Sequence, residues 1–196
     1  MRRASVWLIL AVMPLWVGAA DAVDLNGLLH GDYAVTGEAG CIVALPPGFQ
    51  SDLTPRDGRF VLSNSVQGVR TFNGDGTGTL RGRNVTVTHS DTPDQLGGAS
   101  SSDFQGSFTY NVAPDRTFTT ELNGPLTGTV LTGTRAGQTF TNTVPPLVGR
   151  IAQGKKSLTL ASEVPDVEVL TFSNGDVQYR ICHRSRVLFR LSGEDD

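Results

Sequence analysis

The chain is poor in the residues from which catalytic and metal-binding sites are usually built. Its 196 residues include 3 histidines, 2 cysteines, 2 tryptophans and 2 methionines. No two of the histidines, His30, His89 and His183, are spaced to share a strand or helical face, so the sequence predicts no metal site and no cofactor. Neither Gly-x-Ser-x-Gly nor Ser-x-x-Lys occurs, so serine hydrolysis has no support. We therefore assign no catalytic residues from the sequence.

Both tryptophans and both methionines lie in the first 22 residues, which have the layout of a signal peptide. Arg2 and Arg3 precede an apolar run over 6–17, and small residues follow up to Ala22. A helix that spans a bilayer needs roughly twenty apolar residues, and this run is shorter. We expect 1–22 to be a signal peptide and 23–196 to be a single β-barrel domain. The mature protein would then have no membrane span and would be periplasmic or secreted.

The only two cysteines, Cys41 and Cys182, lie beyond this leader. Thiols pair in an oxidising compartment, so we expect one disulfide that ties the first strands to the last. It would close a loop of about 140 residues and contribute roughly 5 kcal/mol at most. Two unpaired, buried thiols are the alternative.

The rest of the chain has the pattern of strands and turns. Short runs rich in Val, Thr, Phe and Tyr alternate with Gly, Asn, Asp and Pro, and no window has helical apolar spacing. We expect nine or ten strands, long surface loops at 45–58 and 90–103, and a hairpin turn at 73–76. Closing a sheet removes its exposed edges. The predicted fold is therefore all-β, a single antiparallel meander closing into a small β-barrel, with a β-sandwich as the alternative.

Charge excludes one class of partner and raises a question about the last strands. The formal net charge is -3, which does not fit a nucleic-acid-binding protein. Arg180, Arg184, Arg186 and Arg190 share one strand parity, opposite Tyr179 and other apolar residues. Arginine forks suit anions, so this stripe is either an anion-binding wall or a solvated outer face. We favour the outer face.

Two short segments carry a resemblance to a known family. Gly31-Asp32-Tyr33, in the first strand, and Phe189-Arg190-Leu191, in the last, resemble the calycin pattern found in lipocalins, with Tyr33 in place of the usual tryptophan. The resemblance implies a barrel in which Arg190 covers the Tyr33 ring as a structural closure. The segment 181–186 also resembles part of a group of secreted proteobacterial proteins, a resemblance that implies no function.

The leading functional hypothesis is a binding module whose barrel cavity takes a small, partly apolar ligand. The candidate wall residues are Phe104, Phe108, Tyr110 and Tyr179, although the same aromatic residues would equally well fill a solid interior. The sequence does not specify the oligomeric state. A cyclase or isomerase similar to allene-oxide-cyclase-type barrels is the second hypothesis, with Glu121, Glu168, Tyr33 or Arg190 as its polar groups. A structural, envelope-associated protein that acts through its loops is the third.

Overall fold

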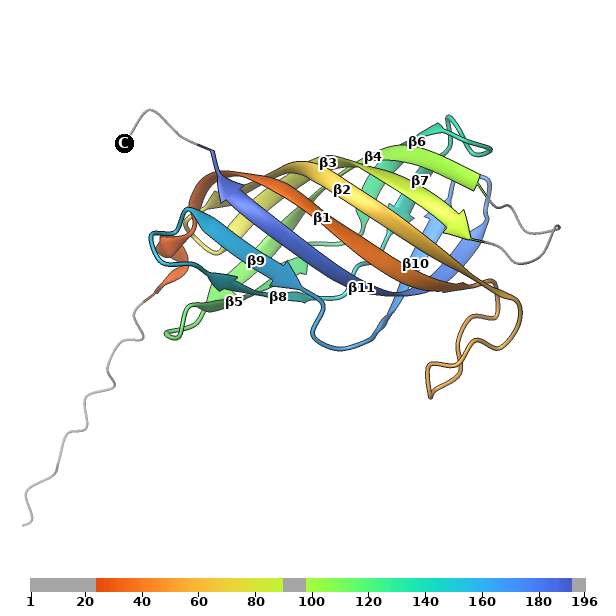
Figure 1. Ribbon diagram of the computed structural model, residues 1–196, viewed down its shortest axis with the longest axis horizontal. Coiled ribbons are helices and arrows are strands. Elements are labelled where there is room, and N and C mark those ends of the chain that lie inside the picture. The colour runs from red at the N-terminus through yellow and green to blue at the C-terminus, as the bar shows by residue number, and fades with distance from the viewer. Residues whose placement is uncertain (1–23, 90–97, 192–196) are drawn as a thin grey trace, which may run out of the picture.

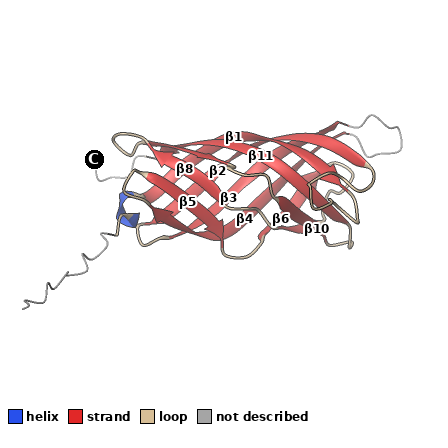
Figure 2. Ribbon diagram, turned by 90° about the horizontal axis from the view of Figure 1, so that it is seen from below, coloured by secondary structure: helices blue, strands red, loops and turns tan. Residues whose placement is uncertain are grey.

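A computed structural model describes residues 24–89 and 98–191, and the predicted signal peptide, 1–22, lies outside this part of the chain. The described residues form one antiparallel sheet of eleven strands and one short 3-10 helix, η1 (Asn26–Leu28) (Figures 1 and 2). The strands are β1 (His30–Ala44), β2 (Arg59–Asn73), β3 (Thr77–His89), β4 (Gly98–Val112), β5 (Thr117–Leu122), β6 (Leu126–Thr132), β7 (Thr139–Asn142), β8 (Leu147–Ile151), β9 (Ser157–Ala161), β10 (Val167–Phe172) and β11 (Val177–Arg190). The all-β, antiparallel prediction is confirmed.

The sheet closes on itself because β1 pairs with both β2 and β11. One ring of hydrogen bonds runs through eight strands, β1-β2-β3-β4-β5-β8-β9-β11. At the other end of the molecule β6, β7 and β10 take the places of β5, β8 and β9 between β4 and β11. The long strands β1 to β4 and β11 therefore span the whole length of the ring, and the six short strands divide the remaining wall into two halves.

Alternation of side chains along each strand decides which residues face the interior. On β4, Phe108, Tyr110 and Val112 are buried and face the interior, while Thr109 and Asn111 are exposed. Successive side chains on a strand point to opposite faces, so the same parity continues toward the start of β4.

Three strands are longer or more continuous than their local composition suggests. β4 begins at Gly98, so 98–103 belongs to a strand and not to the predicted loop. β1 continues to Ala44 through several small residues with weak strand preference. β11 runs unbroken from Val177 to Arg190 and pairs along most of its length with β1.

The predicted disulfide is confirmed. Cys41 and Cys182 face each other in the β1–β11 register, with an S–S distance of 2.02 Å and a Cα–Cα distance of 4.1 Å. Both residues are buried, together with Ala39, Val43 and Leu62. The bridge therefore joins the two strands that close the sheet.

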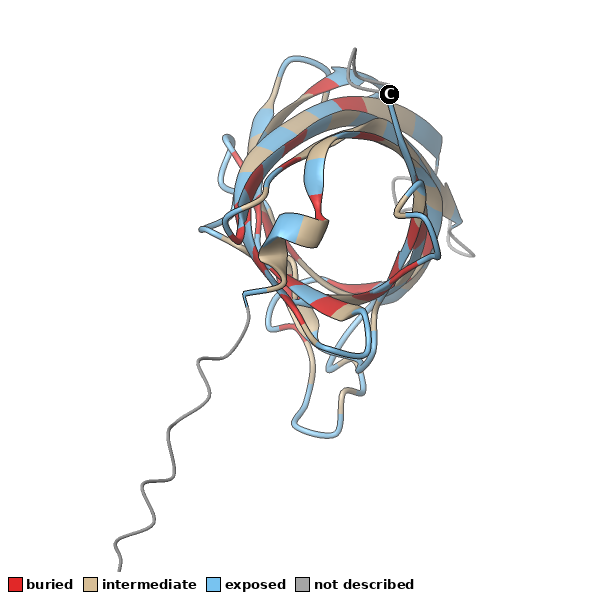
Figure 3. Ribbon diagram, turned by 90° about the vertical axis from the view of Figure 1, so that its left-hand side faces the viewer, coloured by how far each residue is buried: buried red, intermediate tan, exposed pale blue. Residues whose placement is uncertain are grey.

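The end of the ring near η1 is solidly packed. Phe72 lies at the centre of an aromatic cluster, with ring centroids 5.3 Å from Tyr33, 5.3 Å from Phe108 and 5.1 Å from Tyr110, all in edge-to-face geometry. The Tyr110 hydroxyl donates to the Leu29 carbonyl at 2.9 Å, which fixes the end of η1 against this core. Figure 3, which looks at this end, shows η1 lying across part of the ring. One end of the interior is therefore filled and covered.

Candidate functional site

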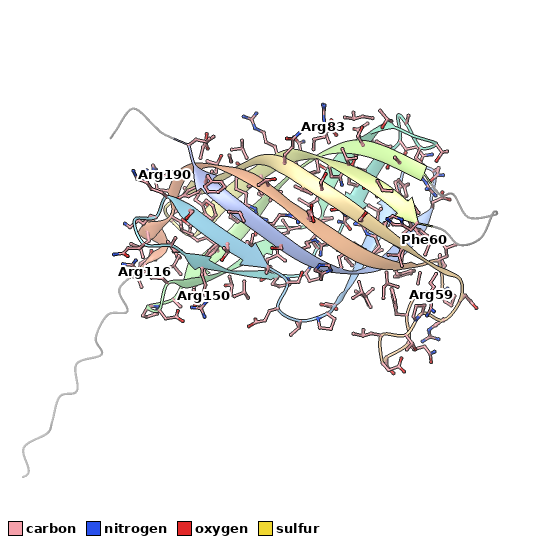
Figure 4. The ribbon with its side chains drawn as sticks, viewed as in Figure 1. Arg59, Phe60, Arg83, Arg116, Arg150 and Arg190 are labelled. Atoms are coloured by element: carbon pink, nitrogen blue, oxygen red, sulfur yellow. A yellow bond between two sulfur atoms is a disulfide. The ribbon has the colours of Figure 1, made fainter. Side chains whose placement is uncertain are left out.

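The other half of the interior contains a cavity of about 450 Å³. It lies between β2, β3 and β4 on one side and β6, β7, β10 and β11 on the other. It reaches exposed residues, Leu45, Gly98 and Thr134, at the end of the ring opposite η1. Phe60, which also lines the cavity, is seen at this end in Figure 4. The cavity thus has a mouth at one end of the molecule and a floor on the packed core.

The size of the inward side chains explains why one half is hollow. On β2 the inner face reads, from mouth to floor, Phe60, Leu62, Asn64, Val66, Gly68, Arg70 and Phe72. On β3 and β4 several cavity positions are also small or polar, including Asn84, Thr86 and Ser102. Large apolar residues are scattered around the cavity but form a continuous cluster in the packed half. Side chains of this kind cannot fill the interior, so the space remains open.

Glycine–aromatic pairs keep two large rings flat against the cavity wall. Phe104 lies directly opposite Gly82 in the β3–β4 register, and Phe140 lies opposite Gly128 in the β6–β7 register. A Cβ atom added to Gly82 would lie 2.7 Å from Phe104 Cζ, and one added to Gly128 would lie 2.5 Å from Phe140 Cζ. Such distances are too short for any pair of nonbonded carbon atoms. The missing side chain therefore lets each ring cover the backbone of its partner strand and leaves the middle of the cavity free.

Three of the four β11 arginines point into this cavity, which overturns the predicted solvated outer face for them, whereas Arg190 is exposed. Arg180, Arg184 and Arg186 share the parity of the buried Cys182 and line the cavity. Opposite Arg186 in the register is Gly37, where an added Cβ would lie 2.7 Å from Arg186 Cδ. Small residues on β1 therefore leave room for long side chains inside the ring.

A buried carboxylate compensates two of these arginines. Glu168 on β10 is fully buried; its Oε1 lies 2.9 Å from Arg180 Nε, and its Oε2 accepts a hydrogen bond from Arg184 Nη2. Oε1 also contacts Cys182 Sγ, a sulfur atom that carries no proton because it is part of the disulfide. Burial lowers the pKa of Arg180, and the charge of Glu168 opposes this effect.

Arg186 and Arg70 have no carboxylate partner in the part of the chain that the structure describes. Arg186 is 8% exposed and donates to the backbone carbonyls of Glu38 and Ser185. Arg70 places its guanidinium carbon 4.9 Å from the centroid of the Phe108 ring, and its buried Nη1 has no hydrogen-bond partner among the described residues. Burial lowers the pKa of each guanidinium to about 10, and the charge of Arg186 contributes to the effect on Arg70.

The cavity is therefore positively charged inside a protein whose net charge is -3. Six arginines line it, and among its described lining residues there is no aspartate or glutamate. Two of the six lie outside the inner cluster: Arg81 is exposed, and Arg135 pairs with Asp176 at 2.9 Å. Among the described residues, only Glu168 opposes the four remaining guanidinium groups, which belong to Arg70, Arg180, Arg184 and Arg186. We refer to these four residues as the arginine cluster.

The predicted wall residues are divided among three places. Phe104 lines the cavity, whereas Phe108 and Tyr110 belong to the packed core. Tyr179 lies on the opposite parity of β11 from the cavity-lining residues, with its ring against Gly48 of the 45–58 loop. Alternation along β11 sends Tyr179 outward because the arginines occupy the inward positions. The aromatic wall is instead made by Phe104 together with Phe60, Phe140 and Phe172.

Tyr33 and Arg190 face each other in the β1–β11 register at the packed end. Tyr33 is 1% exposed and donates from its hydroxyl to the Lys155 carbonyl at 3.3 Å. Burial raises the pKa of this phenol, and the positive charge of Arg190 partly opposes the shift. These two residues lie far along β1 and β11 from the cavity mouth and do not line the cavity.

None of the four polar groups considered for a cyclase or isomerase lines the cavity. Glu121 is exposed on β5, Glu168 is engaged by Arg180 and Arg184, and Tyr33 and Arg190 lie at the packed end. One group of potential metal ligands, Cys41, Cys182 and Glu168, lies within 4.8 Å. Because its two sulfur atoms are bonded to each other, the group offers no thiolate to a metal ion.

The sequence interpretation missed Arg70 and assigned three of the β11 arginines to the wrong face. A signal for the correct face was present, because Arg180, Arg184 and Arg186 share the parity of Cys182. A disulfide between two strands at the seam of a closed sheet is buried here, so its face is the inner one. For Arg70 the same parity argument applies through Leu62 and Phe72, both buried on β2.

The comparisons with protein families and with curated proteins indicate no function for this site. No helix in the described ranges, 24–89 and 98–191, has the length and apolar character needed to cross a membrane. No protein-family model matches the chain, and no curated protein has a significantly similar sequence.

Proposed function

We propose that the closed sheet is a small, calycin-like β-barrel and that the protein is an exported binding module. Its cavity takes one small, partly apolar molecule. The observation that carries this proposal is the division of the interior into a packed half and a hollow half with a mouth. Ligand sites in proteins are typically concave, about 300–1,000 Å³ in volume and mainly apolar, with a few polar groups. The 450 Å³ cavity with its four phenylalanines meets this description.

Two further observations support parts of the proposal. A disulfide at the seam of the sheet agrees with an oxidising compartment, as export to the periplasm or the medium would provide. The opposition of Tyr33 and Arg190 agrees with the calycin resemblance of these two strands. N-terminal sequencing of the protein recovered from the producing cell tests the export step, with Val23 as the expected first residue.

The binding role is tested with N-phenyl-1-naphthylamine, an uncharged, largely apolar fluorophore. We expect saturable binding to the native protein, with a rise in fluorescence and in the thermal unfolding temperature. Val66 lies at mid-depth on the cavity wall, so Val66→Trp places an indole in the cavity and should weaken binding at least about tenfold.

The matched control is Val85→Trp on the neighbouring strand. Val85 is 48% exposed on the outer face, so the same substitution there adds an indole outside the cavity and should leave binding unchanged. Circular dichroism shows whether both variants keep the β-sheet spectrum. No saturable binding by the native protein, or equal binding by both folded variants, would refute a ligand site in this cavity.

A further inference from the structure

The arginine cluster is unevenly compensated, and the uncompensated part lies at the cavity floor. Arg180 and Arg184 share the carboxylate of Glu168. Among the described residues, Arg186 donates only to uncharged carbonyl groups, and Arg70 lies over the ring of Phe108. Two guanidinium charges thus remain without a counterion among the described residues.

The position of these two charges on their strands defines the floor. Arg70 is followed at the next inward position of β2 by Phe72, and Arg186 is followed on β11 by Leu188, both of them buried in the packed core. Each is therefore the last cavity-lining residue on its strand before the core begins. The floor is the part of the cavity farthest from water, where charges interact most strongly because screening is weakest.

Uncompensated buried charges are costly, and the contact of Arg70 with Phe108 and the two carbonyl acceptors of Arg186 supply no opposite charge. Removing a guanidinium from water carries a large desolvation penalty that only an opposite charge or several hydrogen bonds offset. The Nη1 group of Arg70 has no acceptor among the described residues. A bound anion would provide both the missing charge and the missing acceptor, because arginine forks match the paired oxygens of carboxylate, sulfonate and phosphate groups.

The rest of the cavity limits the kind of anion. Between the floor and the mouth the walls carry the rings of Phe60, Phe104, Phe140 and Phe172. A free inorganic ion would leave these apolar surfaces in contact with water. An organic acid with an apolar body would cover them while its head group lies on the floor.

We infer that the cavity binds an amphipathic organic acid, with its anionic head held by Arg70 and Arg186 and its apolar body against the four phenylalanines. The inference rests on the proposed binding function and adds the chemical class of the ligand. It assigns Arg70 and Arg186 to anion recognition and leaves Arg180 and Arg184 to the pairing with Glu168.

The test compares two probes that differ by one acid group. 8-Anilinonaphthalene-1-sulfonate has the same ring system as N-phenyl-1-naphthylamine with a sulfonate added. The native protein should bind the sulfonate at least about tenfold more tightly, equivalent to roughly 1.4 kcal/mol. Arg70→Met and Arg186→Met should each reduce this ratio toward one while leaving the affinity for the uncharged probe nearly unchanged.

Arg83→Met is the matched control, because Arg83 is exposed on the outside of β3 (Figure 4) and should not change the ratio. If Arg70→Met does not fold, Arg70→Gln replaces it. A second measurement separates recognition from a structural role: the urea midpoint of the Arg70 variant should equal or exceed that of the native protein, since a buried uncompensated charge has been removed.

The outcomes are distinguishable. Equal affinity of the native protein for the two probes would refute the anionic ligand but retain the binding site. A preference that persists in both Arg70→Met and Arg186→Met would refute the assignment of these arginines. Failure of both probes to bind would refute the proposed function together with this inference.

Discussion

Glu168 is the residue on which the stability of the arginine cluster depends most directly. It is fully buried and lies between Arg180, at 2.9 Å, and Arg184. At an effective dielectric constant of about 20, two unit charges 2.9 Å apart attract each other by roughly 6 kcal/mol. Desolvation of the carboxylate offsets several kcal/mol of the attraction. Glu168→Gln keeps the shape of the side chain but leaves both guanidinium groups uncompensated.

We expect Glu168→Gln to lower the free energy of unfolding by about 3–5 kcal/mol, the usual effect of breaking a buried ion pair from one side. Urea titration followed by circular dichroism measures this loss. Urea is preferred because guanidinium chloride would screen the charges under test. Glu121→Gln is the control: Glu121 is exposed on β5, so its replacement should change stability by less than about 0.5 kcal/mol.

A loss below about 1 kcal/mol in Glu168→Gln would contradict this reasoning. It would mean that the arginines turn toward the cavity mouth and find solvent when their partner is lost. The arginine side chains would then be able to move away, and the excess positive charge would not be fixed at the cavity floor. A loss in the expected range would instead show that the four guanidinium groups are held in place and not freely solvated.

Two further predictions concern the seam and the turns. Replacing Cys41 and Cys182 together by alanine removes a cross-link between residues 141 apart and should lower the free energy of unfolding by up to about 5 kcal/mol. The reduced native protein should have a urea midpoint similar to that of this double variant. A midpoint equal to that of the oxidised native protein would contradict the prediction. Asp75 and Asp115 accept hydrogen bonds from the backbone and hydroxyl groups of Thr77 and Thr117, which lower the pKa of each carboxyl below its ordinary 3.8. Because the folded state favours the charged form of each carboxyl, this stabilisation is present above pH 3.8 and is lost as the pH falls through the lowered pKa values. Acid unfolding followed by circular dichroism should therefore begin at a higher pH in Asp75→Asn/Asp115→Asn than in the native protein, and superimposable acid transitions would contradict it.

Local sequence was sufficient to predict that strands, turns and one cross-link are present. The alternation around Phe108 and Tyr110 marks a strand with one buried face, and the Asn73-Gly74 turn joins β2 to β3 as expected. Gly74 and Gly76 both have positive φ, which glycine adopts at little cost. These features depend on neighbours in the chain, so they can be recognised without knowing the tertiary structure.

The length and continuity of the strands were harder to predict from the sequence. The first half of β4, 98–103, is rich in Ser and Gly, a composition typical of loops, yet β3 and β6 hold it on both sides. The same is true of Gly37 and Gly40 in β1, which lie between β2 and β11. Pairing on both edges overrides weak local preference, because the ladder hydrogen bonds do not depend on the side chains.

The sequence alone shows that β11 has two different faces, one with arginines and one with Tyr179, Val187 and Phe189. Only the closed sheet decided which face is inside. The usual rule places apolar residues inward, yet Phe189 is 53% exposed and Arg186 only 8%. The reason is that Cys182 must meet Cys41 at the seam and Leu188 must complete the packed core, which turns the arginines inward with them. The buried arginines are tolerated because Glu168 compensates part of their charge and the hollow half of the interior has room for their side chains. Neither Glu168 nor the cavity can be recognised from the sequence of β11 alone.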